Sequence, residues 1–529
     1  MHSKTIITAL ILSLAAGGLL ADDAAGSAKP DAEEGAPGVA LSLRLAEASG
    51  QLQVLREAMA QLEAQRAQLA QRIADLDARW KAVEGSALPG GAAPETAAAR
   101  PVDPRVTPSA ERPAPLSVRL GSAEFTPGGF LDFTGIFRST NVGSGSGTSF
   151  GAIPFKNSSQ GMLSENRFSA QASRISLKIT SKQGRSDLMG YVETDFLGMQ
   201  PTNGLVSSNG NSLRMRLYWV DVRLGKWEVL GGQSWSMLTP NRTGISPLPS
   251  DLFITYNADT NYQVGLVWSR APQFRVLRHW NSNWTTGVSF ENPQQYIGGA
   301  VTLPSSFYSM QVDNGGNVSA PSLHPDIIVK TAFDGHLGKR AVHVEGAGLL
   351  RSFRVVDPSN HRLMGAGGGG SVNLNLEVLS NLRWVANTFY SSGGGRYIFG
   401  LGPDLVIRPD GTPSGVHAAS GIIGLEYQLN PRWVLSAYQG GAYFQRNFSL
   451  DAKGPVGFGY AGSSSTSNRS VEESTVGVVR TLWKRPDLGA LQLIGQYSYV
   501  WRNPWSVAPN SPVDAHTHMV FADLRYTLP

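Results

Sequence analysis

From about residue 117 to the C-terminus, the sequence is built of segments of ten to nineteen residues in which apolar and polar side chains alternate. In residues 366–379, for example, Val372, Leu374 and Leu376 alternate with Asn373 and Asn375. This period of two is typical of β-strands with one apolar and one wet face. We predict sixteen strands, near 128–140, 167–182, 187–198, 212–224, 227–238, 260–270, 273–291, 325–335, 340–356, 366–379, 382–391, 418–430, 432–447, 471–484, 488–502 and 517–528.

The connections between these segments alternate between short and long. Short links fall at 183–186, 225–226, 271–272, 336–339, 380–381, 431 and 485–487, and several carry turn residues such as Gln183-Gly184. Long connections rich in Gly, Ser and Asn lie at 141–166, 292–324 and 448–470. Short turns at one end and long loops at the other are typical of outer-membrane barrels. The even number of strands places both ends of the barrel on the periplasmic side.

No segment after the N-terminal leader approaches the roughly 20 apolar residues that a membrane-spanning helix requires. A membrane form of this chain must therefore be a closed barrel, because only helices and closed barrels satisfy every backbone polar group within lipid. The fold class that we predict is an all-β transmembrane barrel of about 16 antiparallel strands with an N-terminal α-helical coiled coil. Sixteen strands enclose an aqueous channel.

The first 115 residues have a different composition and divide into four parts. Residues 1–21 have the charged start, apolar centre and small-residue end of a signal peptide. Residues 22–38 are polar and acidic and are predicted to be disordered. Residues 39–84 form a predicted periplasmic coiled coil, and the Pro- and Ala-rich residues 85–115 form a linker to the barrel, which spans 116–529.

The coiled-coil prediction depends on apolar residues spaced alternately by three and four positions, apart from Arg66, which occupies one of these positions. They are Leu41, Leu45, Ala48, Leu52, Leu55, Met59, Leu62, Leu69, Ile73, Leu76, Trp80 and Val83. Arg72 with Asp77, and Arg79 with Glu84, have the spacing of ion pairs between parallel chains. We predict a homotrimer; a dimer, or a lone amphipathic helix packed on the barrel, is the alternative.

Charge is distributed unevenly along the chain. Residues 116–529 hold 34 Lys and Arg against 26 Asp and Glu. A basic lining concentrates anions in a pore. The pore-lining residues predicted from strand alternation are Arg138, Arg174, Lys178, Glu193, Asp195, Arg214, Arg216, Lys330 and Arg525, with further lumen carboxylates at Glu377 and Glu426. We expect a basic wall to face an acidic wall across the constriction. The alternative for each arginine is an ion pair that only holds the barrel together.

The sequence also indicates whether the barrel is a pore, an enzyme or a structural protein. The long connection 239–259, with Pro240, Pro247 and Pro249, is a candidate to fold inward and narrow the pore. The chain has no Cys, which excludes disulfides and thiolate metal sites, and it has no Gly-x-Ser-x-Gly nucleophile motif. We therefore predict no enzymatic activity, no cofactor, no metal site and no nucleic-acid partner. The main alternative to a pore is a structural protein that tethers the outer membrane to the periplasm or cell wall.

Several short motifs resemble the DcaP-like trimeric outer-membrane porins. They are Arg214-Met215-Arg216, Leu230-Gly231-Gly232-Gln233-Ser234-Trp235-Ser236, Arg270-Ala271-Pro272-Gln273-Phe274-Arg275, Ser289-Phe290-Glu291-Asn292-Pro293, His324-Pro325-Asp326 and Gly348-Leu349-Leu350-Arg351. The resemblance implies a sixteen-stranded trimer with a periplasmic coiled coil and passive uptake of small, dicarboxylate-like anionic solutes, with most weight on Arg214 and Arg216. The predicted partners are two further copies of the chain, outer-membrane lipid and lipopolysaccharide, and small anions.

Overall fold

We describe the protein from a computed structural model. The structure describes residues 116–199, 211–298, 300–307, 311–312 and 322–529, together with the single positions Gln53, Ala60, Ala67 and Gln71, which are helical. The predicted signal peptide, disordered segment and linker lie outside the described residues, as does the coiled coil apart from those four positions. Among the described residues, no helix is both long and apolar enough to cross a membrane.

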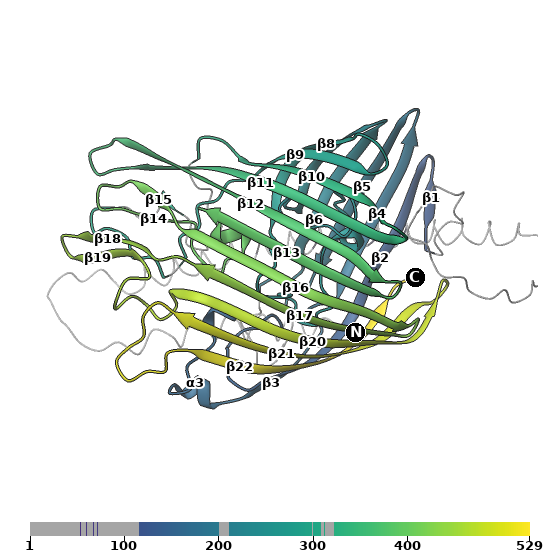
Figure 1. Cartoon of the computed structure of the whole chain (residues 1–529). Helices are drawn as coiled ribbons and strands as arrows, with labels where there is room; N and C mark the ends of the chain where they lie inside the picture. The colour runs from purple at the N-terminus through teal and green to yellow at the C-terminus, as the bar shows by residue number, and fades with distance from the viewer. Residues whose placement is uncertain are drawn as a thin grey trace, which may run out of the picture. The chain divides into compact units, whose positions relative to one another are not determined.

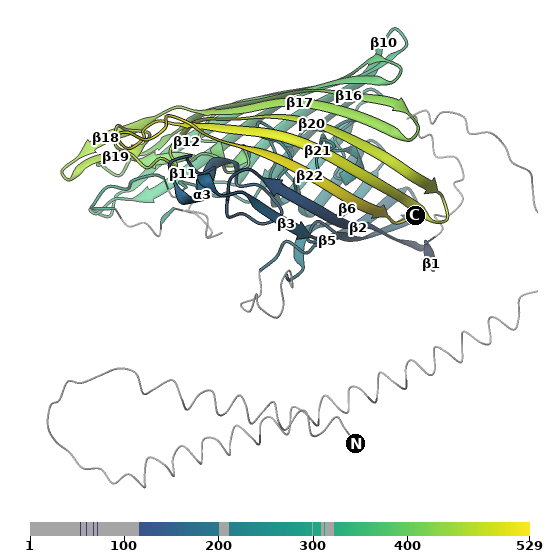
Figure 2. The same ribbon diagram turned by 90° about the horizontal axis from the view of Figure 1, so that it is seen from below.

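Sixteen antiparallel strands form one closed barrel (Figure 1). The strands are β2 (Ala123–Arg138), β4 (Arg174–Gln183), β5 (Ser186–Asp195), β6 (Arg214–Leu224), β7 (Trp227–Trp235), β8 (Arg270–His279), β9 (Trp284–Glu291), β10 (Asp326–Leu337), β11 (Arg340–Val356), β12 (Arg362–Leu379), β13 (Leu382–Ser392), β16 (His417–Asn430), β17 (Trp433–Phe444), β20 (Asn468–Arg485), β21 (Gly489–Pro504) and β22 (Ala515–Thr527). Each strand pairs with the next, and β22 pairs with β2 to close the ring, as Figure 2 also shows.

Shorter elements decorate this ring. β1 (Val118–Leu120) pairs with the start of β2, and β3 (Glu165–Ser169) pairs with its second half. Two hairpins, β14 (Leu405–Ile407) with β15 (Pro413–Gly415) and β18 (Asn447–Asp451) with β19 (Gly454–Phe458), lie in the long loops. The helical elements there are α3 (Ser159–Met162), η1 (Phe150–Ala152), η2 (Pro249–Asp251) and η4 (Gly395–Tyr397).

Alternation within the strands sorts side chains between lipid and lumen. In β2, Leu131 and Phe133 are exposed on the outer face, whereas Asp132 and Thr134 are buried on the inner face. Exposed and buried side chains alternate in the same way along β22, where Val520 and Leu524 face outward. An apolar outer band and a polar interior are the distribution that a lipid-embedded barrel requires.

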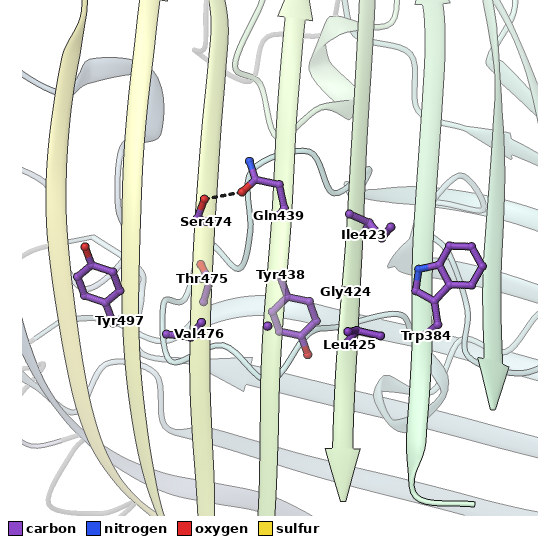
Figure 3. Close-up of a pocket in the computed structure, with 11 residues that line it drawn as sticks. Trp384, Ile423, Gly424, Leu425, Tyr438, Gln439, Ser474, Thr475, Val476 and Tyr497 are labelled. Atoms are coloured by element: carbon purple, nitrogen blue, oxygen red, sulfur yellow. Dashed lines mark hydrogen bonds between the residues drawn. The ribbon is translucent and has the colours of Figure 1, made fainter. Parts of the chain in front are cut away.

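The outer face of β13 to β21 carries a shallow apolar depression of about 480 Å³ (Figure 3). Trp384, Ile423, Leu425 and Tyr497 are among the residues that line it. Two outward polar side chains drawn there are joined, because the hydroxyl of Ser474 donates a hydrogen bond to the Oε1 of Gln439.

Two of the predicted strands were wrong in detail although the number of strands was right. Residues 260–269 form no strand; they belong to a loop, 236–269, that connects β7 to β8. The predicted strand 273–291 is instead two strands, β8 and β9, joined by a short turn at 280–283. The predicted short link at 271–272 lies inside β8. The two errors cancel, which keeps short turns at one end and long loops at the other.

Candidate functional site: the loop and the arginine cluster in the lumen

The loop 236–269, here called the constriction loop, crosses the inside of the barrel. In the first part of the loop, Arg242 forms an ion pair of 2.7 Å with Glu426 of β16. Further along, the backbone N–H of Tyr256 donates to the hydroxyl of Tyr438 in β17, at 3.2 Å. The expected inward fold of 239–259 is therefore observed, and the inserted segment is longer than predicted.

Carboxylates on the inner wall hold the backbone of the constriction loop. The N–H groups of Met237, Asn241 and Val264 donate to the carboxylates of Glu291, Glu345 and Glu473, at 2.8, 2.9 and 2.9 Å. An irregular loop leaves backbone donors that no ladder satisfies, and these three glutamates accept from them.

The returning part of the loop lies directly against the wall. A side chain at Gly440 of β17 would meet the carbonyl oxygen of Val264 at 1.8 Å, and one at Gly265 would meet that of Gly421 at 2.1 Å. Gly265 also has a φ of +91°, which favours glycine. The sequence places glycines here because the two backbones are in contact.

Four arginines from three strands gather where the loop returns to the β4–β8 wall: Arg174 of β4, Arg214 and Arg216 of β6, and Arg270 of β8. We call them the arginine cluster. Arg214 donates to both oxygens of Asp195, at 3.0 and 2.7 Å. Arg216 bridges Glu193 at 2.6 Å and Asp195 at 2.8 Å. Two carboxylates thus face four guanidinium groups.

The other two arginines have no carboxylate partner within the part of the chain that the structure describes. Arg270 lies over the ring of Trp235 at 5.5 Å, and its Nη1 is buried without a hydrogen-bond partner. Arg174 lies over Phe130 at 5.1 Å and has an unpartnered Nε. Arg214 keeps 38% of its side chain exposed. Partly exposed and uncompensated guanidinium groups in a lumen attract anions.

Tyr262, at the tip of the returning loop, completes the cluster. Its hydroxyl accepts hydrogen bonds from Arg174 at 3.0 Å and Arg216 at 3.5 Å. The residue is buried and has a φ of +62°, unusual for an aromatic side chain. Burial raises the pKa of the hydroxyl, but the two guanidinium groups outweigh burial and lower the pKa to about 8.

The structure assigns other roles to several predicted pore residues. Arg138 is fully buried and holds the loop that follows β2, through Glu165 at 2.6 Å and Thr148 at 3.2 Å. Lys330 is also buried and binds the constriction loop through the Thr239 carbonyl at 2.9 Å. Arg138 thus matches the alternative given for the arginines, an ion pair that holds the barrel together, and Lys330 supports the constriction loop.

The remaining predicted residues lie on the lumen wall outside the cluster. Arg525 pairs with Asp132 at 2.7 Å and with Asp523 at 3.1 Å. Lys178 is half-buried opposite Tyr191 and forms no ion pair with a described residue. The predicted acidic wall facing a basic wall was wrong for Glu193 and Asp195, because they lie on β5, next to the arginines that they neutralise.

A second group of charges was missed by sequence reasoning. Arg351 of β11 pairs with Asp326 at 3.0 Å and Asp404 at 2.9 Å, and Arg396 pairs with Asp326 at 2.9 Å. All four side chains are buried, and they join the loop after β13 to the strand wall. Trp268 of the constriction loop stacks on Phe399 of that loop at 4.7 Å. The two inserted loops therefore support each other inside the mouth.

Sequence comparison identifies no relative: no family model and no curated protein matches the chain. Comparison of structures finds the outer membrane channel DcaP of Acinetobacter baumannii, with a TM-score of 0.56 and 16% identity over 77% of this chain and 98% of that chain. This chain has the fold of the DcaP channel. The resemblance expected from the short motifs is confirmed at the level of fold.

Other outer-membrane proteins match with lower scores. An anion-selective porin from Comamonas acidovorans has a TM-score of 0.45 and 12% identity over 77% of this chain and 100% of its own. Salmonella typhi OmpF, solved with daunomycin, has a TM-score of 0.45 and 9% identity over 78% of this chain and 100% of its own.

Proposed function

We propose that the protein is an outer-membrane porin through which small hydrophilic solutes diffuse, with a preference for anions. One observation carries the preference: four guanidinium groups face two carboxylates beside the constriction loop. The apolar outer band and the sorting of short turns and long loops support the location in the outer membrane. The DcaP-type fold supports a channel, and dicarboxylate-like solutes fit a site that presents several guanidinium groups to carboxylates.

Within this proposal the arginines have separate tasks. Arg216 fixes the geometry, because it is buried and saturated by Glu193 and Asp195. Arg174 and Arg270 supply the uncompensated charge. An anion passing the cluster exchanges water for guanidinium donors, and it is released because no donor set surrounds it completely.

We also propose that three copies of the chain assemble and that the N-terminal coiled coil joins them in the periplasm. The heptads at 39–84 support this assembly. Cross-linking of the full chain and of a variant lacking residues 39–84 measures the contribution of the coiled coil. Loss of the trimer on deletion is the expected result.

The selectivity test is the reversal potential of the refolded full chain in planar bilayers across a salt gradient. Arg174→Gln with Arg270→Gln removes the two uncompensated charges and leaves the Arg214–Asp195 and Arg216–Glu193 pairs intact. The matched control, Arg480→Gln, removes a charge from the exposed outer face near Trp433. We expect the double variant to lose anion preference and the control to keep it. A wild-type channel that conducts without anion preference refutes the selectivity and leaves the porin assignment in place.

A further inference from the structure

Two arginines stand on the outer face of the barrel at the end that carries the long loops. Arg446 follows β17 and Arg469 lies at the start of β20, and both are exposed. Neither forms an ion pair or a hydrogen bond within the part of the chain that the structure describes. Both instead lie over the ring of Trp505, at 5.4 and 5.9 Å.

Trp505 is anchored by hydrogen bonds to two neighbouring segments of the chain. Its indole N–H donates to the carbonyl oxygen of Phe444 at 3.0 Å, and its backbone N–H donates to that of Ser467 at 2.9 Å. Tyr443, which is exposed on the outer face of β17, packs edge-on against the ring at 6.2 Å. A side chain at Gly459 would meet the ring at 2.5 Å and the Arg446 Cβ at 2.9 Å. The platform under the two guanidinium groups is thus packed on several sides.

The level of this platform relative to the membrane follows from the outward aromatic residues. The half of the outer face nearer the long loops carries Tyr497, Tyr499 and Trp501 on β21 and Tyr443 on β17. Rings of Tyr and Trp mark the membrane–water interface of barrels. Arg446 and Arg469 lie just beyond these rings, so they stand at the height of lipid headgroups.

We infer that Arg446, Arg469 and Trp505 form a binding site for the phosphate of a phosphorylated glycolipid in the outer leaflet. Guanidinium groups are suited to phosphate because they present several donors in one plane. Cation–π contact orients them without consuming their charge. Glu472, which lies one row nearer the membrane centre, forms no ion pair with either arginine, so both charges are available. The inference rests on the proposed outer-membrane location and is independent of anion selectivity.

The test measures binding of diphosphoryl lipid A, and of the same lipid without phosphates, to the refolded full chain in detergent by native mass spectrometry. The variant is Arg446→Gln with Arg469→Gln. The matched control is again Arg480→Gln, whose guanidinium also lies over a tryptophan, Trp433 at 5.2 Å, but at the short-turn end of the barrel. Heat-modifiable migration in gels confirms that each variant is folded.

Each basic residue at an anionic membrane surface contributes about five-fold to binding, so we expect the double variant to bind diphosphoryl lipid A about 30-fold more weakly. We expect the control to bind as the wild type does, and the lipid without phosphates to bind weakly to all three proteins. Equal binding of the two lipids by the wild type, an unaffected double variant, or an equal loss in the control overturns the inference. Displacement of the lipid by excess inorganic phosphate would assign the site to the free ion instead.

Discussion

Ion selectivity of the pore should fall as the pH rises through about 8, because Tyr262 then becomes a counter-ion of the arginine cluster. Its hydroxyl contacts Arg174 and Arg216, which lower its pKa to about 8. Below that pH the phenol is neutral, and the four arginines, Glu193 and Asp195 carry a net charge of about two. Above it the phenolate leaves a net charge of about one. The proposed anion preference should therefore be complete at low pH and weaken at high pH.

The size of the effect follows from Coulomb's law. With a pKa of about 8, roughly a tenth of Tyr262 is ionised one pH unit below and nine tenths one unit above. One unit charge at about 6 Å changes the energy of a passing ion by about 0.7 kcal/mol in bulk water, and by more beside a low-dielectric wall. Because this charge repels an anion and attracts a cation by the same energy, the two terms add to about 1.1 kcal/mol, and the ratio of anion to cation permeability should fall about six-fold between pH 7 and 9.

The assay is the reversal potential at both pH values for the wild type and for Tyr262→Phe, which keeps the ring and removes the titrating group. The other charged groups of the cluster, among them Glu193 and Asp195 from β5 and Arg270 from β8, are common to both proteins, so the difference isolates Tyr262. Absorbance at 295 nm follows tyrosinate formation independently. A wild-type permeability ratio that stays constant from pH 7 to 9, or one that falls equally in Tyr262→Phe, refutes the reasoning.

Three further predictions concern the inserted loops. Glu473→Ala removes the acceptor of the Val264 N–H and should increase single-channel conductance and open-channel noise; a trace identical to the wild type argues against a pinned loop. Gly440→Val drives a side chain into the Val264 carbonyl and should alter conductance, whereas barrel folding, read by gel migration, should persist. Asp326→Ala removes an ion-pair partner from two buried arginines, Arg351 and Arg396. Such a loss typically lowers the free energy of unfolding by about 3–5 kcal/mol, so the temperature of thermal unfolding should drop clearly.

The barrel itself was predictable because a transmembrane strand must alternate between lipid and water. β11, for example, was predicted with its observed bounds, Arg340–Val356. Residues 260–269 misled the prediction because they contain the apolar run Val264, Leu266 and Val267, which here packs inside the lumen instead of against lipid. Period alone does not distinguish an apolar loop buried in protein from an apolar strand.

The arginine cluster was only partly predictable. Arg174, Arg214 and Arg216 were assigned to the lumen by alternation, and the structure brings them together. Arg270 was missed as a pore residue because the strand β8 was given the wrong start. The pairing of β5 with β6 shifts register between Glu193 and Thr194, so Leu217 is buried although it directly follows the buried Arg216. A bulge of this kind leaves no signal in a single sequence.

Charge and loop architecture are coupled in this lumen. The wall carries many carboxylates, yet Glu291, Glu345 and Glu473 accept hydrogen bonds from backbone N–H groups of the constriction loop, and all three are buried. A carboxyl group that is enclosed by protein and bonded to the loop backbone is out of contact with solutes in the pore. The uncompensated arginines, by contrast, lie where the loop leaves the wall partly exposed. We therefore propose that the loop contributes to the anion preference, because it covers these acidic groups and leaves basic ones accessible to a solute.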